Sequence, residues 1–496
     1  MTANLIPSYG HWINGAEVPP ESGNWIETSD PYRGTVWARI ARGGPQDVNR
    51  AVAAAKAAMT TGPWAKMSAT QRGKILRRIA DATLAEIDRL TELEVRDNGK
   101  LVGDIRGGLN FKADVWTYYA GLADKIEGSV LPIDKPDMLA LTFREPVGVV
   151  AAITAWNSPL QFLAVKCAPA LAAGCAVVVK PSEFSTVTSL EFARIASAAG
   201  LPDGVLNVIS GFGAEVGPTL VDHRDVAMIT FTGSDTTGAR IYEQAARSMK
   251  RVTMELGGKS PNIIFEDANL DAAAAGAVSG IFGAAGQMCT AGSRLLVQNS
   301  VKEEITRRIL AIARNVKLGD PMDPATQMGP ISNRPQFDKV LSYIEIARHD
   351  GARLIHGGKP AQGAGLASGS FFEPTIFADV RNDMRIAQEE VFGPVLSIIG
   401  FDTEEEAIHI ANDINFGLAA GIWTKDMGRM IRMVKAIDAG TVWGNTYRTY
   451  SFMMPFGGRK RSGLGKEWGI EGMEEFLDTK SVMISTADVL PGFVPR

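Results

Sequence analysis

The sequence is poor in cysteine and histidine. Among 496 residues there are three cysteines and five histidines. So few cysteines, in an odd number, argue against a disulfide framework and for a reducing compartment, so we expect a cytoplasmic protein. The histidines do not recur at i, i+4 spacing and do not accompany a cysteine pair, so no metal site is expected.

The sequence also lacks a strong excess of one charge and a segment with the pattern of a transmembrane helix. The net charge is -4 and the basic residues are scattered, so neither a nucleic acid nor a membrane is an expected partner. The N-terminus, MTANLIPSYGHWING, lacks the features of a signal peptide. Two uncharged stretches, Pro146–Val165 and Ala272–Ser293, carry polar residues at their centre or end. We expect them to be buried elements of a globular fold that binds small molecules.

Short apolar segments alternate with helical ones, which is typical of parallel sheets covered on both faces. A first alternation predicts strands at Val149–Ile153, Ala176–Val179, Val205–Val208 and Val226–Phe231, with helices at Pro159–Ala173, Thr186–Ala199, Ala214–Val221 and Thr236–Ala246. A second predicts strands at Asn262–Ile264, Ser293–Val297 and Val395–Phe401, with helices at Val301–Val316, Arg334–His349 and Thr403–Ile414. The fold class is therefore α/β, with two doubly wound α/β domains that meet at a cleft near Glu255–Lys259.

The N-terminal region and the chain ends predict smaller elements. Residues 1–47 have the pattern of short strands and turns, followed by a helix over Val48–Met59 and one long helix from Ser68 to Leu93, opened by a Ser68–Gln71 capping box. Ser129–Ile133 and Met138–Phe143 suggest a hairpin, and the tail segment Ser481–Ser485 is a candidate to cover it. Because an open strand edge is a liability, we expect these pieces to meet across a subunit interface.

One cysteine stands among small residues in the stretch FGAAGQMCTAG. Cys289 there is open to approach by a substrate, which favours a nucleophile, although free cysteines are commonly inert core residues. The small residues of this stretch, Gly286, Ala291 and Gly292, are expected to leave room for that substrate.

Other chemistry-bearing residues fall at predicted strand ends. Gly233 and Ser234 open a helix, an arrangement that favours phosphate or is simply a tight turn. Asn157 suits an oxyanion donor, although spacing alone favours a helix cap. Glu255 ends an apolar strand, which suits a general base if the side chain is buried. Lys180 and Glu183 suit ribose binding or a solvated loop.

Together these segments resemble the aldehyde dehydrogenase superfamily over nearly the whole chain. The matching motifs, in order, are TAWNSP, VVVKPSE, FTGS, MELGGKSPNII, GQMCTAGSR, EEVFGPV, NFGLAAGIWTKD and PFGGRKRSGLGKEWG. The resemblance implies an NAD(P)-binding domain (1–127 and 147–256), a catalytic domain (257–460) and a small β oligomerisation element (128–146 and 477–496) in a homodimer or homotetramer.

The resemblance also implies residue roles. Cys289 would attack the aldehyde of a small substrate, Asn157 and the Cys289 backbone would hold the oxyanion, and Glu255 would activate water to release a carboxylic acid. Lys166 and Glu467 match a proton-relay pair. The implied cofactor-binding residues are Trp156, Lys180, Glu183, Gly213, Gly233, Ser234, Gly238, Glu390 and Phe392. Glu183 favours NAD over NADP, with NADP kept as an alternative.

The chain departs from the family pattern beside the predicted nucleophile. Ser158 stands where many members have Phe, and Ala155 where Pro is common. The implied substrate pocket consists of Ser158, Met288, Thr290, Arg448, Tyr450 and Phe456, and Arg448 could bind a substrate carboxylate or form a surface ion pair. The alternatives are a CoA-acylating dehydrogenase, which Glu255 disfavours, and a non-catalytic structural or binding protein on the same fold.

Overall fold

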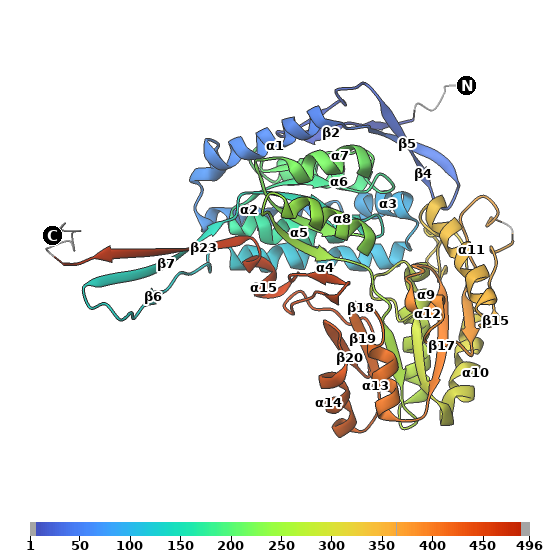
Figure 1. Cartoon of the computed structure of the whole chain (residues 1–496). Coiled ribbons are helices and arrows are strands. Elements are labelled where there is room, and N and C mark those ends of the chain that lie inside the picture. Colours follow the sequence, from blue (N-terminus) through green and yellow to red (C-terminus); the bar gives the residue numbers. More distant parts are fainter. Residues whose placement is uncertain (1–5, 364, 488–496) are drawn as a thin grey trace, which may run out of the picture.

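The computed structural model describes residues 6–363 and 365–487, and it contains two large sheets, each covered by helices (Figure 1). The first sheet has the order β22-β12-β11-β8-β9-β10-β2-β3. Its strands are β2 (His11–Ile13), β3 (Ala16–Val18), β8 (Val149–Ile153), β9 (Ala176–Lys180), β10 (Leu206–Val208), β11 (Val226–Thr232), β12 (Arg251–Glu255) and β22 (Gly463–Leu464). The five central strands, β12 to β10, run parallel.

Successive residues of the central strands face opposite helical layers, as the period of a strand requires. Val177 and Val179 of β9 pack toward one layer, and Val178 packs toward the other. The first layer includes α2 (Ala69–Ala85), α3 (Ile87–Asn98), α4 (Val102–Leu122), α5 (Pro159–Ala173) and α6 (Val187–Ala198). The second includes α1 (Pro45–Thr60), α7 (Gly213–Asp222) and α8 (Asp235–Ala246).

The second sheet has the order β15-β16-β17-β14-β13-β19-β20 and lies in the lower part of Figure 1. Its strands are β13 (Pro261–Ile264), β14 (Arg294–Gln298), β15 (Arg353–His356), β16 (Thr375–Ala378), β17 (Val395–Phe401), β19 (Ala419–Trp423) and β20 (Thr441–Gly444). Its main helices are α9 (Leu270–Phe282), α10 (Lys302–Ala313), α11 (Arg334–His349), α13 (Glu404–Asn412) and α14 (Met427–Ala436). The predicted α/β class with two doubly wound sheets is confirmed.

The single long helix predicted from Ser68 to Leu93 is wrong. The Ser68–Gln71 capping box is present, but α2 ends at Ala85, and α3 begins at Ile87. Glu86 between them leaves helical geometry, with φ −104° and ψ 19°. The bend lets α3 pack against both α4 and α6. Helix α4 was not predicted.

The remaining elements are short. A small sheet near the N-terminus consists of β1 (Ser8–Tyr9), β5 (Thr35–Ala41) and β4 (Trp25–Asp30), as the strand-and-turn pattern of that region predicts. β18 (Phe416–Gly417) pairs with β21 (Arg459–Lys460), and α12 (Arg385–Gln388) and α15 (Gly469–Glu474) are helices of one or two turns. No helix within 6–363 and 365–487 combines the length and apolarity needed to cross a bilayer.

A three-stranded arm projects from the body (Figure 1) and consists of β6 (Val130–Leu131), β7 (Met138–Pro146) and β23 (Leu477–Ser485). β23 pairs antiparallel with β7 from Leu477–Pro146 to Ser485–Met138. The hairpin and tail therefore meet within one chain, which corrects the expectation that they meet across a subunit interface. Residues 1–5 of the N-terminus and 488–496 of the predicted tail lie outside the described residues.

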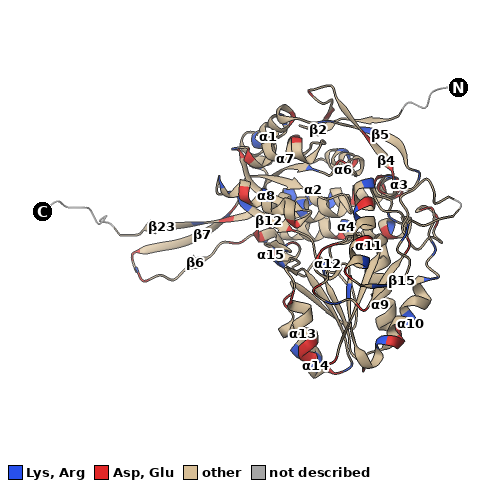
Figure 2. Cartoon of the chain, turned by 45° about the vertical axis from the view of Figure 1, so that its right-hand side comes forward, with Lys and Arg blue, Asp and Glu red and all other residues tan. Residues whose placement is uncertain are grey.

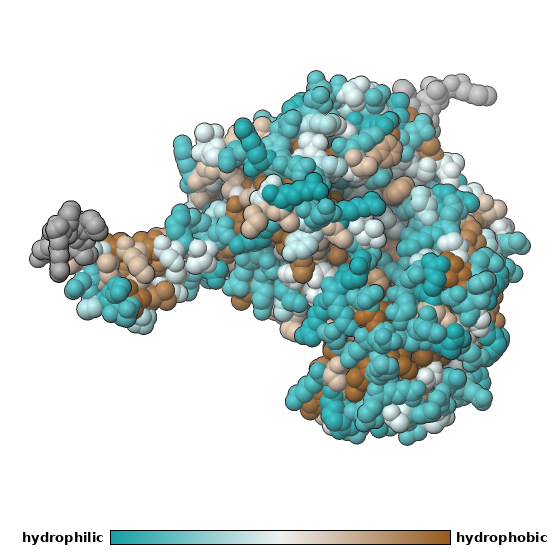
Figure 3. All heavy atoms as spheres, in the orientation of Figure 1, coloured by the Kyte–Doolittle hydropathy of each residue, from teal (hydrophilic) through white to brown (hydrophobic). Residues whose placement is uncertain are grey.

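The exposed surface of the arm differs in character from that of the body. Brown, hydrophobic atoms are visible on the arm in Figure 3. The large apolar side chains exposed on its strands are Val130, Leu131, Leu139, Phe143, Met483 and Ile484. On the body, basic and acidic residues are interspersed along the helices (Figure 2), so neither sign dominates a face in that view.

Candidate active site

Cys289 lies in the loop between α9 and β14, after the 3-10 turn Gly283–Gly286. It is partly exposed, whereas Cys167 and Cys175 are fully buried. The loop borders a cavity to which both sheets contribute. Its lining includes Trp156, Thr232 and Ser234 from the first sheet's side, and Cys289, Glu390 and Phe392 from the second. Of the three cysteines, Cys289 alone lines this cavity.

The small residues around Cys289 are occupied by protein rather than left open for ligands, which corrects the prediction for them. A Cβ on Gly286, whose φ is +71°, would lie 2.0 Å from the Gly393 carbonyl oxygen, and one on Gly292 would lie 2.9 Å from the Tyr447 hydroxyl. Ala291 is buried. These residues let the loop turn and pack closely.

The surroundings of Cys289 hold its thiol protonated at neutral pH. Desolvation, with the negative charges of Glu255 and Glu390 adding to it, raises the pKa of the Cys289 thiol to about 12. A thiol in this state needs a proton acceptor before it can attack a carbonyl, because the thiolate is the nucleophile.

Glu255, whose charge acts on that thiol, is a carboxylate of unusual basicity. It ends β12, as predicted, and is only 6% exposed. Neither carboxylate oxygen accepts a well-formed hydrogen bond from the described residues, although the Gly458 backbone is a weak donor nearby. Burial, reinforced by the charge of Glu467, raises the pKa of Glu255 well above its usual range. A carboxylate in this state is suited to accept protons near neutral pH.

Asn157 is not the helix cap that its spacing favoured. The residue at the N-cap of α5 is Ser158. The Asn157 Nδ2 instead donates a hydrogen bond of 2.9 Å to the backbone carbonyl of Gln287, and both partners are buried. The Gln287 side chain is itself fixed, because its Oε1 accepts from the Ser332 N–H at 2.8 Å. The Asn157 amide is thus held against the Cys289 loop.

Lys166 and Glu467 form a buried pair next to Glu255. The Lys166 Nζ donates to Glu467 Oε1 at 2.6 Å and to Thr230 Oγ1 at 3.1 Å. The Lys166 side chain is 1% exposed and that of Glu467 is 11% exposed. The pair brings together residues 301 positions apart in the sequence.

The predicted ribose-binding residues lie at the carboxyl end of β9. Lys180 is 3% exposed and its Nζ lies 3.3 Å from Glu183 Oε2. Burial lowers the pKa of Lys180, and Glu183 opposes that shift. Gly213, the first residue of α7, would place a Cβ 4.0 Å from the Lys180 Nζ.

The predicted phosphate-binding turn follows β11. Ser234 caps α8 by accepting from the Thr237 N–H at 3.3 Å, and the Gly233 N–H donates to the Glu255 carbonyl at 3.2 Å. Gly238 allows α8 to pack on Leu256, whose Cδ2 would lie 2.6 Å from an added Cβ. The Thr232 hydroxyl is buried without a hydrogen-bond partner in the described chain.

Glu390 and Phe392 form the opposite wall of this cavity. Glu390 Oε1 accepts from the Gly258 N–H at 3.0 Å, and burial raises the pKa of Glu390. Phe392 packs edge-on against Trp156 at a centroid distance of 5.3 Å. The cavity thus has aromatic walls, a fixed carboxylate and a helix N-terminus.

Aromatic residues cluster on the other side of the Cys289 loop. The hydroxyls of Thr290 and Tyr450 share a 2.5 Å hydrogen bond. The Tyr450 ring packs edge-on against Phe456 at 6.2 Å and Trp468 at 5.5 Å. Met288 packs partly on the core beside α9. Trp468 was not predicted, although it directly follows Glu467 in the matched motif.

Two lysines in this region, Lys100 and Lys112, were not predicted from the sequence. The Lys100 Nζ donates to the Ser158 Oγ at 2.5 Å. Lys112 of α4 is 6% exposed and is among the charges that act on Lys100. Nothing in the local sequence places Lys100 at Ser158, because the two residues are 58 positions apart and meet only through tertiary packing.

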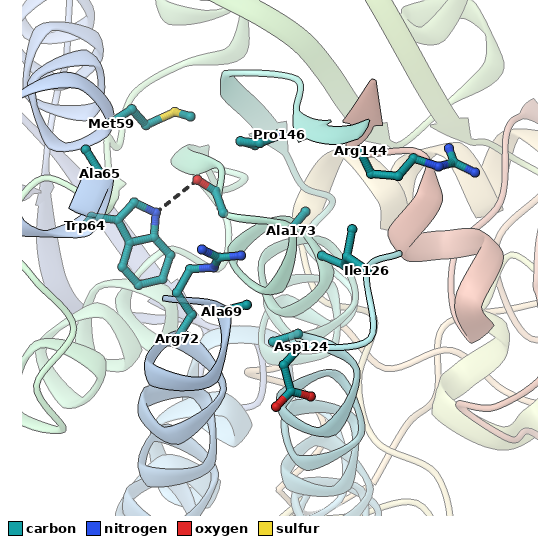
Figure 4. A pocket seen from close by; sticks show the side chains of 12 residues that line it. Met59, Trp64, Ala65, Ala69, Arg72, Asp124, Ile126, Arg144, Pro146 and Ala173 are labelled. Atoms are coloured by element: carbon teal, nitrogen blue, oxygen red, sulfur yellow. Dashed lines mark hydrogen bonds between the residues drawn. The ribbon is translucent and has the colours of Figure 1, made fainter. Parts of the chain in front are cut away.

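A second cavity lies at the root of the arm (Figure 4) and shares no lining residue with the Cys289 cavity. Trp64, Arg72 and Arg144 are among its lining residues. The Trp64 ring N–H donates to the Gly174 carbonyl at 3.1 Å, which ties the segment before α2 to the end of α5. None of the predicted site residues lines this cavity.

The chain matches known proteins along almost its full length. The model of the aldehyde dehydrogenase family matches residues 18–482. The chain belongs to the aldehyde dehydrogenase family. The crystal structure of a point mutant of betaine aldehyde dehydrogenase from Staphylococcus aureus, in complex with NAD+ and with a BME-modified cysteine, has a TM-score of 0.97 and 39% identity, covering 99% of this chain and 100% of that chain. An NAD-dependent aldehyde dehydrogenase from Sinorhizobium meliloti has a TM-score of 0.96 and 40% identity, covering 99% and 97%.

As a member of the aldehyde dehydrogenase family, the protein is an enzyme that oxidises an aldehyde. The predicted family and enzyme class are confirmed. Cys289 and Asn157 both line the cavity between the two sheets.

Proposed function

We propose that this aldehyde dehydrogenase converts a small aldehyde to a carboxylic acid with NAD as the hydride acceptor, by the hydrolytic route. The hydrolytic route is supported by the state of Glu255. This carboxylate is buried, has a raised pKa and accepts no well-formed hydrogen bond from the described residues. Such a group can take a proton from the Cys289 thiol and later from water.

In the first step the Cys289 sulfur bonds to the aldehyde carbon while its proton passes to Glu255. The carbonyl π electrons move to oxygen, which forms a tetrahedral oxyanion on the thiohemiacetal. One N–H of the Asn157 amide is used on the Gln287 carbonyl, and the second remains to donate to that oxyanion together with the Cys289 backbone N–H.

In the second half of the reaction the thioester on Cys289 is hydrolysed. Glu255 removes a proton from water, the hydroxide oxygen bonds to the acyl carbon, and the carbon–sulfur bond breaks to release the acid and the thiolate. Lys166 and Glu467, paired at 2.6 Å beside Glu255, give the proton held by Glu255 a route away from the site.

The residues of the cavity fit a dinucleotide. A helix N-terminus at Ser234 favours phosphate, Lys180 and Glu183 offer a donor and an acceptor for ribose hydroxyls, and Glu390 with Phe392 forms the wall beside Cys289. When bound, NAD accepts a hydride from the carbon attached to Cys289. Support for NAD comes from Glu183, whose charge would repel a 2′-phosphate, and from the NAD+ complex of the Staphylococcus aureus enzyme.

The assembly and domain division are part of the same proposal. The apolar side chains exposed on the arm suit contact with a second copy, in a homodimer or homotetramer in the cytoplasm. Residues 1–127 and 147–256 form the NAD(P)-binding domain, 257–460 the catalytic domain and 128–146 with 477–496 the oligomerisation element. β22 adds to the first sheet by pairing with β12, so its segment belongs with the cofactor side.

The experiment is an aldehyde panel with NAD and with NADP, followed by absorbance of the reduced nicotinamide. Cys289→Ala should show no turnover of any aldehyde, because no other cysteine lines the cavity. The matched control is Cys167→Ala, a buried cysteine in the core, which should retain activity. Full steady-state activity in Cys289→Ala would refute the mechanism.

A further inference from the structure

Three cationic side chains, Lys100, Lys112 and Arg448, act on one another electrostatically in the region of Ser158 and the turn that leads to Cys289. Lys100, between α3 and α4, donates to Ser158, the neighbour of Asn157. Lys112 and Arg448 are both among the charges that act on Lys100. The Arg448 guanidinium lies close to Gly283, where the turn leading to Cys289 begins, since an added Cβ there would be 2.9 Å from Nη2.

None of the three cations has an ion-pair partner among the described residues. Across the described ranges, 6–363 and 365–487, neither Lys100, Lys112 nor Arg448 has an acidic oxygen within 4.0 Å. The Arg448 Nη1 is buried and lacks a hydrogen-bond partner among the same residues. Burying a guanidinium nitrogen without a hydrogen-bond acceptor costs folding free energy unless a ligand supplies the acceptor.

The backbone and the local charges support a ligand rather than a structural role. Arg448 has φ +57°, a strained conformation for a residue with a long side chain. The acidic groups that act on Lys100 are Glu94 and Asp104, against Lys112 and Arg448 of its own sign. Glu94 is buried and leaves one oxygen unpaired, so it forms no ion pair that closes the cluster. Three cations against two carboxylates leave positive charge at this place.

We propose that Arg448, with Lys100 and Lys112, binds the carboxylate of an aldehyde substrate that carries both groups, an ω-oxo acid. The inference rests on the proposed function and names its substrate class. A planar guanidinium matches a planar carboxylate by two parallel hydrogen bonds, and the Ser158 hydroxyl, held by Lys100, adds a further polar contact. The same cations repel a quaternary ammonium aldehyde such as betaine aldehyde, although the Tyr450, Phe456 and Trp468 rings could attract one.

The test measures kcat/KM of the wild-type enzyme, with NAD, for three types of aldehyde. They are ω-oxo carboxylates of three to six carbons, n-alkanals of the same lengths, and betaine aldehyde. The best ω-oxo carboxylate should have a kcat/KM at least about tenfold above that of its alkanal, the equivalent of one carboxylate contact. A kcat/KM for the alkanal or for betaine aldehyde that equals or exceeds it would overturn the proposal.

A second experiment uses the variants Arg448→Gln and Lys112→Met. Arg224→Gln is the matched control, because the Arg224 side chain is 92% exposed. The ratio of kcat/KM for the ω-oxo carboxylate to that for the alkanal should fall about 30-fold or more in Arg448→Gln, with KM carrying most of the change. The ratio in Arg224→Gln should stay at the wild-type value. An unchanged ratio in both Arg448→Gln and Lys112→Met would overturn the proposal.

These outcomes separate the substrate class from the proposed function. If the wild-type enzyme oxidises alkanals through Cys289 but does not prefer ω-oxo carboxylates, the carboxylate site is wrong and the aldehyde chemistry stands. If Cys289→Ala oxidises either probe at the wild-type rate, the proposed mechanism itself fails.

Discussion

The Asn157 Nδ2 donates a 2.9 Å hydrogen bond to the backbone carbonyl of Gln287, two residues before Cys289. This contact joins the segment at the start of α5, in a layer of the first sheet, to the loop before β14 of the second sheet, which carries the proposed nucleophile. Because the amide has two N–H groups, one fixes its orientation and the other is free to face a developing oxyanion. The two sheets are thus joined where the proposed chemistry needs rigidity.

Asn157→Asp should lower kcat about 10²- to 10³-fold, the usual cost of losing one oxyanion donor. The carboxylate cannot donate, and it places a negative charge where the oxyanion forms. The measurement is steady-state oxidation of the best aldehyde in the panel. Thermal melting checks that the variant folds, and a kcat within twofold of wild type would show that the amide does not contact the oxyanion.

Glu255→Gln should uncouple acylation from deacylation. Since the pKa of Glu255 is raised, the wild-type carboxylate is protonated at low pH and becomes a base as the pH rises through that pKa, so activity should rise with pH over that range. In Glu255→Gln this rising limb should disappear, and a rapid burst of reduced nicotinamide should precede a slow steady state. Glu345→Gln, on the exposed face of α11, serves as the control. An unaltered pH profile in Glu255→Gln would place the base elsewhere.

The Lys166–Glu467 pair should be costly to break from one side. Lys166→Met leaves the buried Glu467 carboxylate uncompensated and should destabilise the protein by about 3–5 kcal/mol. The double variant Lys166→Met/Glu467→Gln should recover part of this loss, because no buried charge remains unpaired. Denaturant unfolding at fixed protein concentration measures both. Equal stability of the single and double variants would argue that Glu467 finds another partner.

The cofactor preference should depend on Glu183. Glu183→Gln removes the charge that would repel a 2′-phosphate and frees the Lys180 Nζ, which lies 3.3 Å from it. The ratio of kcat/KM for NADP to that for NAD should rise about tenfold, which corresponds to about 1.4 kcal/mol. Initial rates with each cofactor at saturating aldehyde give the ratio. No change, or a wild-type enzyme that prefers NADP, would show that Glu183 does not select the cofactor.

The central strands and their helices were predictable from sequence because local patterns determine them. The predicted bounds of β8, α5, α11 and β17 match those of the structure. Their apolar residues follow the period of the element and are bounded by turns. The break at Glu86 was missed because both α2 and α3 keep a helical pattern, and only the packing of α3 on α6 distinguishes two helices from one.

Residues of the candidate site were predictable only where they lie within a recognisable sequence motif. Cys289, Glu255 and the strand-end residues carry recognisable local sequence. The role of Asn157 was ambiguous, because spacing alone favoured a helix cap. Only the folded structure shows that its amide donates to the Gln287 carbonyl, 130 positions away in the sequence. Lys100 and Lys112 carry no local signal, since the contact of Lys100 with Ser158 and the packing of α4, which carries Lys112, against α5 arise only in the folded chain.

The apolar surface of the arm should determine the assembly state. Phe143 and Val130 are 50% and 70% exposed within the single chain, and burying such side chains contributes about 1.5–3 kcal/mol each. The double variant Phe143→Ser/Val130→Ser should therefore shift the protein toward monomers at micromolar concentration, as measured by sedimentation velocity. Ile312→Ser on α10, also an exposed apolar residue of the body, is the matched control and should leave the sedimentation coefficient unchanged. If the arm variant sediments like the wild type, the interface lies elsewhere on the surface.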